Sequence, residues 1–222
     1  MNWQIDQQTQ QVATAHPIPI HANAPSPQFA GRNFNPQNWN QRVIQPANWP
    51  PGPLISSPQA IIQHFQNGNY LQGLALVASW GTMWRRPAAI WGQRPLQVID
   101  QALHLCAQDI QNTQSINQAW TILTGNLPGQ LGWSAVISSK TLHFLCRSLG
   151  FGHDPPVALD NKVILNNVWP VFVANIPRAQ RPQNWRGNTL AAYLRYMTAI
   201  LTWAGQKGWT TTDMEATIFD QY

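Results

Sequence analysis

Apolar residues recur at helical spacing through most of the chain after residue 57, and this periodicity most limits what the sequence can fold into. It is clearest between Asn188 and Gly205, where apolar side chains fall three or four positions apart and a glycine follows them. No stretch sustains the strict alternation of a half-buried strand, although the strings ALVASW and VILNNVW are short and ambiguous. The sequence therefore predicts an all-α fold.

Capping residues mark where several of these helices begin. Ser57 before Pro58 is typical of a helix start, because the serine side chain can cap the helix and proline fits its first position. Further helices are predicted from Leu96 to Ile110, after a cap at Ser115, from Asn188, and behind a capping box formed by Thr212 and Glu215.

Residues 1–53 differ in composition from the rest of the chain. They are rich in Gln, Asn and Pro and lack helical periodicity, but they contain several large aromatic residues. Because so many aromatic side chains are unsuited to a freely solvated tail, we expect an extended arm that packs on the body. Residues 54–222 are then the helical domain.

Charge and cysteine content narrow the class of function. The chain has 13 Lys plus Arg against 8 Asp plus Glu, a net charge of +5, and this small basic excess suits a polyanionic partner. Cys106 and Cys146 are too few for a disulfide framework or a four-thiolate cluster, and no HExxH motif occurs. We expect buried thiols, no metal and no cofactor. The N-terminal residues lack a signal-peptide pattern and no run of about 18 apolar residues occurs, so we expect a cytoplasmic protein without membrane association.

The stretch from Gly125 to Trp169 contains the candidate chemistry. It reads as a Gly/Pro turn, a helix, a Gly/Pro loop and a second helix. A cap at Ser138 or Ser139 would place Lys140 in the first turn of the first helix, where the helix dipole disfavours a cation. Since a lysine must lose its charge to act as a nucleophile, this position favours such a role for Lys140.

An aspartate follows twenty residues later. Asp160 comes directly after the apolar run PPVAL, at the expected start of the next helix, where free backbone N–H groups stabilise a carboxylate. The two residues also have a simpler explanation, in which Asp160 is only an N-cap and Lys140 a solvated surface residue.

The order and spacing of these residues resemble the helix-hairpin-helix DNA glycosylases, and within them the 8-oxoguanine glycosylases. The resemblance rests on the glycines of LPGQLG, on Lys140 after them, and on PPVALDNKV ahead of Trp169. It extends weakly to SWGTMWRR at Ser79–Arg86 and to the C-terminal helices. It implies a helical domain of two lobes with the active site between them, in which Lys140 attacks the sugar and Asp160 stabilises the charge that develops.

The hairpin departs from the pattern of this family. The family sequence has the form LPGxG with the lysine close behind it, whereas Lys140 lies eight residues after Gly132. Either the hairpin carries an insertion, or Trp133 to Ser139 form it and the LPG string is coincidental.

Other residues are candidates for the contacts that base flipping requires. Aromatic rings near the resembling strings can face a flipped base, and cations or hairpin amides can hold phosphate. The candidates for the base pocket are Trp80, Trp84, Trp133 and His143, and those for DNA contacts are Arg85, Arg86, Gly129, Gly132, Ser139 and Arg147.

The resemblance implies a monomer that acts on double-stranded DNA containing a modified base. One substrate is glucosylated 5-hydroxymethylcytosine of phage DNA, which small bacterial phage-defence glycosylases remove, and the Asn/Gln/Trp-rich arm favours it because a sugar-bearing base needs a wide, amide-rich pocket. The alternatives are 8-oxoguanine repair, a non-catalytic helical DNA-binding module, and an arm that binds carbohydrate.

Overall fold

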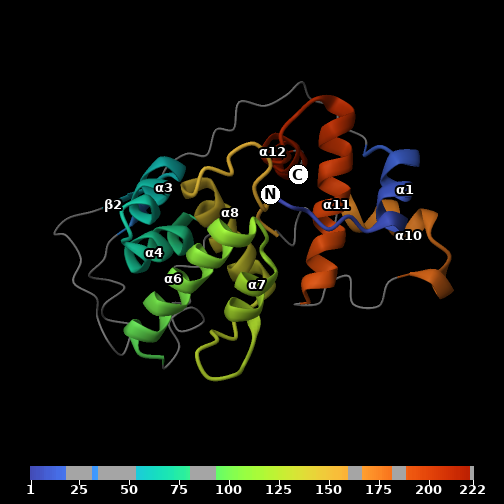
Figure 1. The fold of residues 1–222 in the computed structure, drawn as a ribbon. Helices are drawn as coiled ribbons and strands as arrows, with labels where there is room; N and C mark the ends of the chain where they lie inside the picture. Colours follow the sequence, from blue (N-terminus) through green and yellow to red (C-terminus); the bar gives the residue numbers. More distant parts are fainter. Residues whose placement is uncertain (19–31, 35–53, 81–93, 160–166, 182–188, 221–222) are drawn as a thin grey trace. The chain divides into compact units, whose positions relative to one another are not determined.

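The computed structural model describes residues 1–18, 32–34, 54–80, 94–159, 167–181 and 189–220, and these are mainly helical (Figure 1). This confirms the predicted all-α class. The strands β1 (Arg32–Phe34) and β2 (Leu54–Ser56) form one short antiparallel pair in which Asn33 faces Ile55.

Contacts divide the chain into two units. One consists of Met1–Gln28 with Gly152–Tyr222, and the other of Phe29–Phe151. The predicted boundary at residue 53 is therefore not the one that the contacts give.

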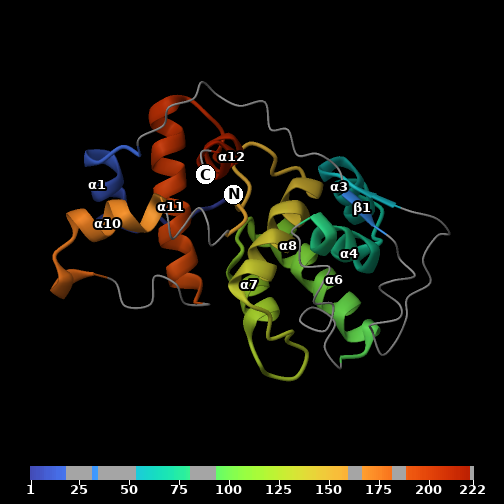
Figure 2. The same cartoon turned by 180° about the vertical axis from the view of Figure 1, so that it is seen from behind.

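The unit that holds both ends of the chain consists of α1 (Gln7–Ala15), α10 (Trp169–Asn175), the short 3-10 helix η3 (Arg178–Gln180), α11 (Leu190–Lys207) and α12 (Thr211–Asp220). Helix α1 lies against α10 and α11 (Figure 2). The buried Trp203 of α11 donates from Nε1 to the carbonyl of Ala13 over 3.0 Å. The expectation of an extended arm is thus wrong for residues 7–15, because Asp6 caps a helix there by accepting from the N–H of Thr9.

Helix α11 begins and ends near the predicted residues but not at them. Its cap is Thr189, whose side chain accepts from the N–H of Ala192, and not Asn188. The helix continues past Gly205 and ends at Gly208, which has the left-handed conformation (φ +68°) that favours glycine.

The capping box of α12 also lies earlier than predicted. Thr210 and Asp213 cap each other, because the Asp213 carboxylate accepts from the N–H and hydroxyl of Thr210 while the Thr210 hydroxyl accepts from the N–H of Asp213. The box predicted from Thr212 and Glu215 is wrong, and Glu215 is buried.

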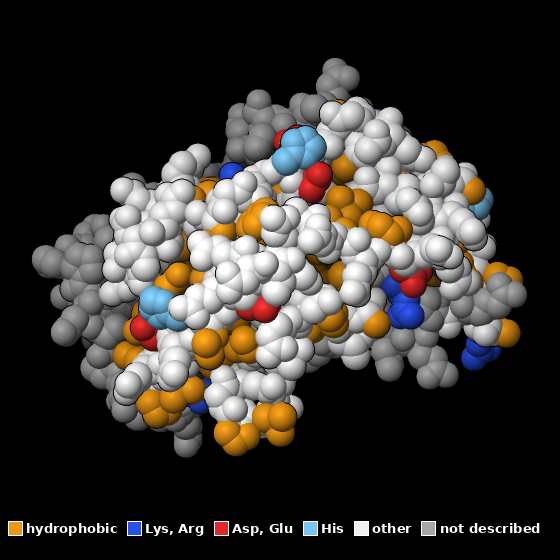
Figure 3. All heavy atoms as spheres, in the orientation of Figure 1, with side chains coloured by type: hydrophobic (Ala, Val, Ile, Leu, Met, Phe, Trp, Pro, Cys, Tyr) orange, Lys and Arg blue, Asp and Glu red, His pale blue; other side chains and the backbone are white. Residues whose placement is uncertain are grey.

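Neutral side chains dominate the face of the molecule in Figure 3, where charged groups are few and scattered among polar and apolar ones. Among the described helices, none is long and apolar enough to cross a membrane.

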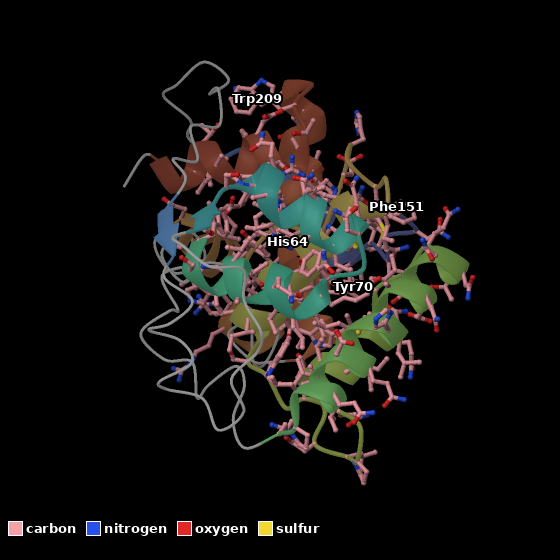
Figure 4. The ribbon with its side chains drawn as sticks, turned by 90° about the vertical axis from the view of Figure 1, so that its left-hand side faces the viewer. His64, Tyr70, Phe151 and Trp209 are labelled. Carbon is pink, nitrogen blue, oxygen red and sulfur yellow. The ribbon has the colours of Figure 1, made fainter. Side chains whose placement is uncertain are left out.

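The other unit contains α3 (Pro58–Gln66), α4 (Tyr70–Trp80), α6 (Leu96–Thr113), α7 (Asn117–Thr124) and α8 (Ala135–Ser148). The predicted start of α3 is confirmed, since Ser57 accepts from the N–H of Ala60. Helices α3 and α4 pack closely because Gly73 leaves room for the ring of Phe65, and Figure 4 shows these two helices with His64 and Tyr70 labelled. Helix α8 packs against α3, α4, α6 and α7. This arrangement places the helix that carries Lys140 at the centre of the unit.

Candidate functional site

The hairpin lies between α7 and α8, in the loop that contains LPGQLG. Two backbone hydrogen bonds close it, from Leu131 to the carbonyl of Ile122 (2.9 Å) and from Trp133 to that of Leu123 (2.8 Å). Since α8 already begins at Ala135, the alternative hairpin from Trp133 to Ser139 is wrong.

Both hairpin glycines have positive φ, +83° at Gly129 and +62° at Gly132. The backbone N–H groups of these two glycines have no acceptor among the described residues. Such unpaired N–H groups can bind an anionic oxygen.

Arg94 is a cation at this hairpin that the sequence analysis missed. Its guanidinium lies 3.2 Å from the position that a side-chain carbon on Gly132 would occupy, and the Asn126 side-chain oxygen lies 2.6 Å from the same point. Arg94 makes no ion pair or hydrogen bond within the described part of the chain. No local signal could have found it, because the approach joins segments 38 residues apart. The loop therefore has unpaired N–H groups at both glycines and a guanidinium beside Gly132.

The N-cap of helix α8 lies four residues before the first predicted cap, Ser138. Ser134 has the extended backbone of an N-cap (ψ 156°), and its carbonyl accepts from the N–H of Ser138. Ser138 and Ser139 are fully buried inside the helix. The prediction that either serine caps the helix is wrong, and Lys140 lies in the second turn and not the first. At this position the helix dipole no longer disfavours the cation of a lysine.

Lys140 is nevertheless in an unusual environment for a lysine, since only 6% of it is exposed. Its Nζ lies 5.8 Å from the ring centroid of Trp80 on α4. Trp80 in turn meets Phe144 edge-on, with the ring centroids 5.0 Å apart and the planes at 88°. A cation over an aromatic face is attracted by the ring's quadrupole, so Trp80 helps to hold the ammonium group in place. The simpler explanation of Lys140 as a solvated surface residue is wrong.

Two more basic side chains share the face of α8 with Lys140. His143 and Arg147 follow it at intervals of three and four residues, so the three lie along one stripe of the helix. His143 is buried, and its Nε2 lies 3.4 Å from the Arg147 guanidinium. Arg147 is half-buried, and burial lowers the pKa of its guanidinium. A guanidinium can only donate, so the imidazole of His143 is the acceptor in this contact.

Besides Lys140 and His143, two more predicted site residues are buried. Ser139 is fully buried and donates to the carbonyl of Val136 in its own helix, so its hydroxyl is not placed to contact a phosphate. Trp133 is 2% exposed, which leaves no ring face for a base. Burial therefore contradicts the predicted phosphate contact of Ser139 and the predicted base-pocket role of Trp133. Four further predicted residues, Trp84, Arg85, Arg86 and Asp160, lie outside the described residues.

Comparison of the chain with protein-family models, with curated proteins and with solved structures finds no match. The helical fold thus assigns the protein to the all-α class.

Proposed function

We propose that this protein is a DNA glycosylase that excises a modified base, with Lys140 as the attacking amine. The observation that carries the proposal is the burial of Lys140 in the helix that follows a glycine hairpin, with its Nζ near the ring of Trp80. Lysine is seldom buried without a specific reason, because removing its charge from water is costly. A covalent role in catalysis is one such reason.

The proposed reaction begins with the flipping of the target nucleotide out of the duplex. The lone pair of Lys140 Nζ forms a bond to C1′, and the glycosidic bond breaks with its electron pair leaving on the base, which takes up a proton. Nζ loses a proton and the sugar ring opens, which gives a protonated imine between Lys140 and the sugar. Asp160 has the proposed role of stabilising the positive charge that develops on the sugar. If Nζ does not reach C1′, water attacks and an abasic site is the product.

Base release from a modified duplex, measured by chromatography of the free base, tests the proposal. We expect Lys140→Ala and Asp160→Asn to lose release while both variants still bind DNA. Lys207→Ala is the matched control, since Lys207 is an exposed lysine at the end of α11. Release that is unchanged in Asp160→Asn and Lys140→Ala would rule the proposal out.

The hairpin is the proposed contact with the DNA backbone. The N–H groups of Gly129 and Gly132 and the guanidinium of Arg94 are donors suited to a phosphate. We expect Arg94→Ala to weaken binding to all duplexes alike and to lower the slope of log affinity against log salt by about one. Arg178→Ala removes the same charge from an exposed site in the other unit and is expected to leave the slope unchanged.

For the substrate we propose glucosylated 5-hydroxymethylcytosine, in line with the resemblance and the amide-rich N-terminal residues. Duplexes that differ at a single position, carrying this base, 8-oxoguanine or an unmodified cytosine, distinguish the substrates. Release of 8-oxoguanine alone would assign the protein to repair. Binding to all three duplexes without release from any would identify a non-catalytic DNA-binding module.

A further inference from the structure

The PPVAL run, residues 155–159, is buried although it belongs to no helix or strand. Val157, at its centre, is only 1% exposed. Irregular segments normally lie on the surface, because their backbone N–H and C=O groups find no regular partners inside a protein. The two prolines of the run also have no N–H with which to form a ladder. Its carbonyl groups therefore need donors from other elements.

One face of α11 supplies partners for the middle of the run. Tyr193, Tyr196 and Met197 follow one another at intervals of three and one residues, so they project from the same side of the helix. The carbonyl of Val157 accepts from the Tyr193 hydroxyl over 2.8 Å, and its N–H donates to the Met197 sulfur over 3.3 Å. The Tyr196 hydroxyl donates to the carbonyl of Ala158 over a longer 3.4 Å. Both tyrosines are at most 1% exposed, so bulk water has no direct access to these bonds.

Two other segments hold the start of the run. The Thr211 hydroxyl, at the start of α12, donates to the carbonyl of Pro155 over 3.2 Å. The indole N–H of Trp3, ahead of α1, donates to the carbonyl of Asp154 over 3.2 Å. All these residues belong to the unit that holds both ends of the chain. Side chains from three distant parts of the sequence thus bind four of the five carbonyls between residues 154 and 158.

We propose that Tyr193 and Tyr196 are positioning residues for Asp160, which follows the PPVAL run directly in the chain. By holding the carbonyls of Val157 and Ala158, they fix the backbone from which the carboxylate extends. The inference rests on the proposed function, in which Asp160 stabilises the charge that develops on the sugar. Such stabilisation requires close placement, and a shift of about 1 Å can lower a rate about a hundredfold.

Single-turnover base release tests the proposal, with whichever of the three duplexes the wild type acts on. The amplitude of release reports the fraction of competent protein, and the rate constant reports the reaction. We expect Tyr193→Phe to lower the rate constant about ten- to hundredfold. Tyr196→Phe, which removes the longer bond, should lower it less. The affinity for DNA should keep its wild-type value, because the charge that Asp160 stabilises develops only in the transition state.

Trp203→Phe is the matched control. It also removes one donor to a backbone carbonyl from a buried aromatic side chain of α11, but its acceptor is Ala13 of α1 and not the PPVAL run. We expect this variant to keep the wild-type rate constant even if its amplitude falls. A purely structural role of the tyrosines predicts the same behaviour for Tyr193→Phe.

The outcomes separate this proposal from the proposed function. A wild-type rate constant in Tyr193→Phe, or an equal loss in Trp203→Phe, would overturn the positioning role while base release by the wild type upheld the glycosylase. If Tyr193→Phe does not fold, Tyr196→Phe is compared with Trp203→Phe in the same way, and a wild-type rate constant there would overturn the role. Absence of release by the wild type from any duplex would refute the proposed function, and the positioning role with it.

Discussion

The hairpin can be tested by placing one methyl group at each of its two glycines. Gly129 and Gly132 both have positive φ, so alanine at either costs about 1–2 kcal/mol of unfolding free energy. Only at Gly132 would the new carbon meet neighbours, with Asn126 Oδ1 at 2.6 Å and the Arg94 guanidinium at 3.2 Å, whereas nothing lies within 4 Å at Gly129. Both neighbours are the ends of flexible side chains that can move aside, so Gly132→Ala should also lose about 1–2 kcal/mol in total.

Urea unfolding followed by tryptophan fluorescence measures the stability of the two variants, and the anisotropy of a labelled duplex measures their DNA affinity. Because they share the cost of the backbone conformation, the two variants should lose similar stability and differ only in the contact with Asn126 and Arg94. Gly132→Ala should therefore weaken DNA binding more than Gly129→Ala, by displacing the Arg94 guanidinium. Equal DNA affinities of the two variants would refute the close approach at Gly132, and with it the placement of Arg94 at the hairpin.

Three further predictions concern the core and its titratable groups. Burial lowers the pKa of His64 from 6.5, so its contribution to stability is complete above about pH 6.5 and is lost as the pH falls toward the folded-state pKa. The urea midpoint should fall more between about pH 7.5 and pH 5 in the wild type than in His64→Gln, and equal falls would contradict this. Trp203→Phe removes the donor to Ala13 and should lower the free energy of unfolding by about 1–3 kcal/mol. Relative to the wild type, amide exchange should become faster in α1 but not in α8. An equal increase in both helices would exclude a local role for this hydrogen bond. Burial raises the pKa of the Cys106 and Cys146 thiols far above the usual range, and both are 0% exposed, so a disulfide reagent should modify neither in the native protein and both in denaturant. Rapid modification of the native protein would show that this core opens.

The helices were predictable because apolar spacing is local, but several of their ends were not. Ser134, Ser138 and Ser139 are all acceptable caps by residue type. The choice among them depends on Trp133, whose burial and hydrogen bond to Leu123 fix where the loop ends. Such a contact between the loop and α7 cannot be predicted from the sequence around the serines.

Two other features depend on distant parts of the chain. Helix α1 has weak periodicity, and the contacts of Ala13 with Trp203 come from a segment 190 residues away. Arg94 precedes a helix without any spacing that relates it to the hairpin. By contrast, Lys140 could be singled out from the sequence, although its burial and its neighbour Trp80 depend on how α4 packs against α8.

Borohydride trapping followed by peptide mapping tests the central claim most directly, because reduction of the proposed imine leaves the sugar attached to the amine that attacked it. With a duplex that contains glucosylated 5-hydroxymethylcytosine, we predict a single adduct on Lys140, absent from Lys140→Ala and retained in Lys207→Ala. Base release without an adduct would show that water attacks. An adduct on another residue, or excision that persists in Lys140→Ala, would contradict the assignment of Lys140 as the attacking amine.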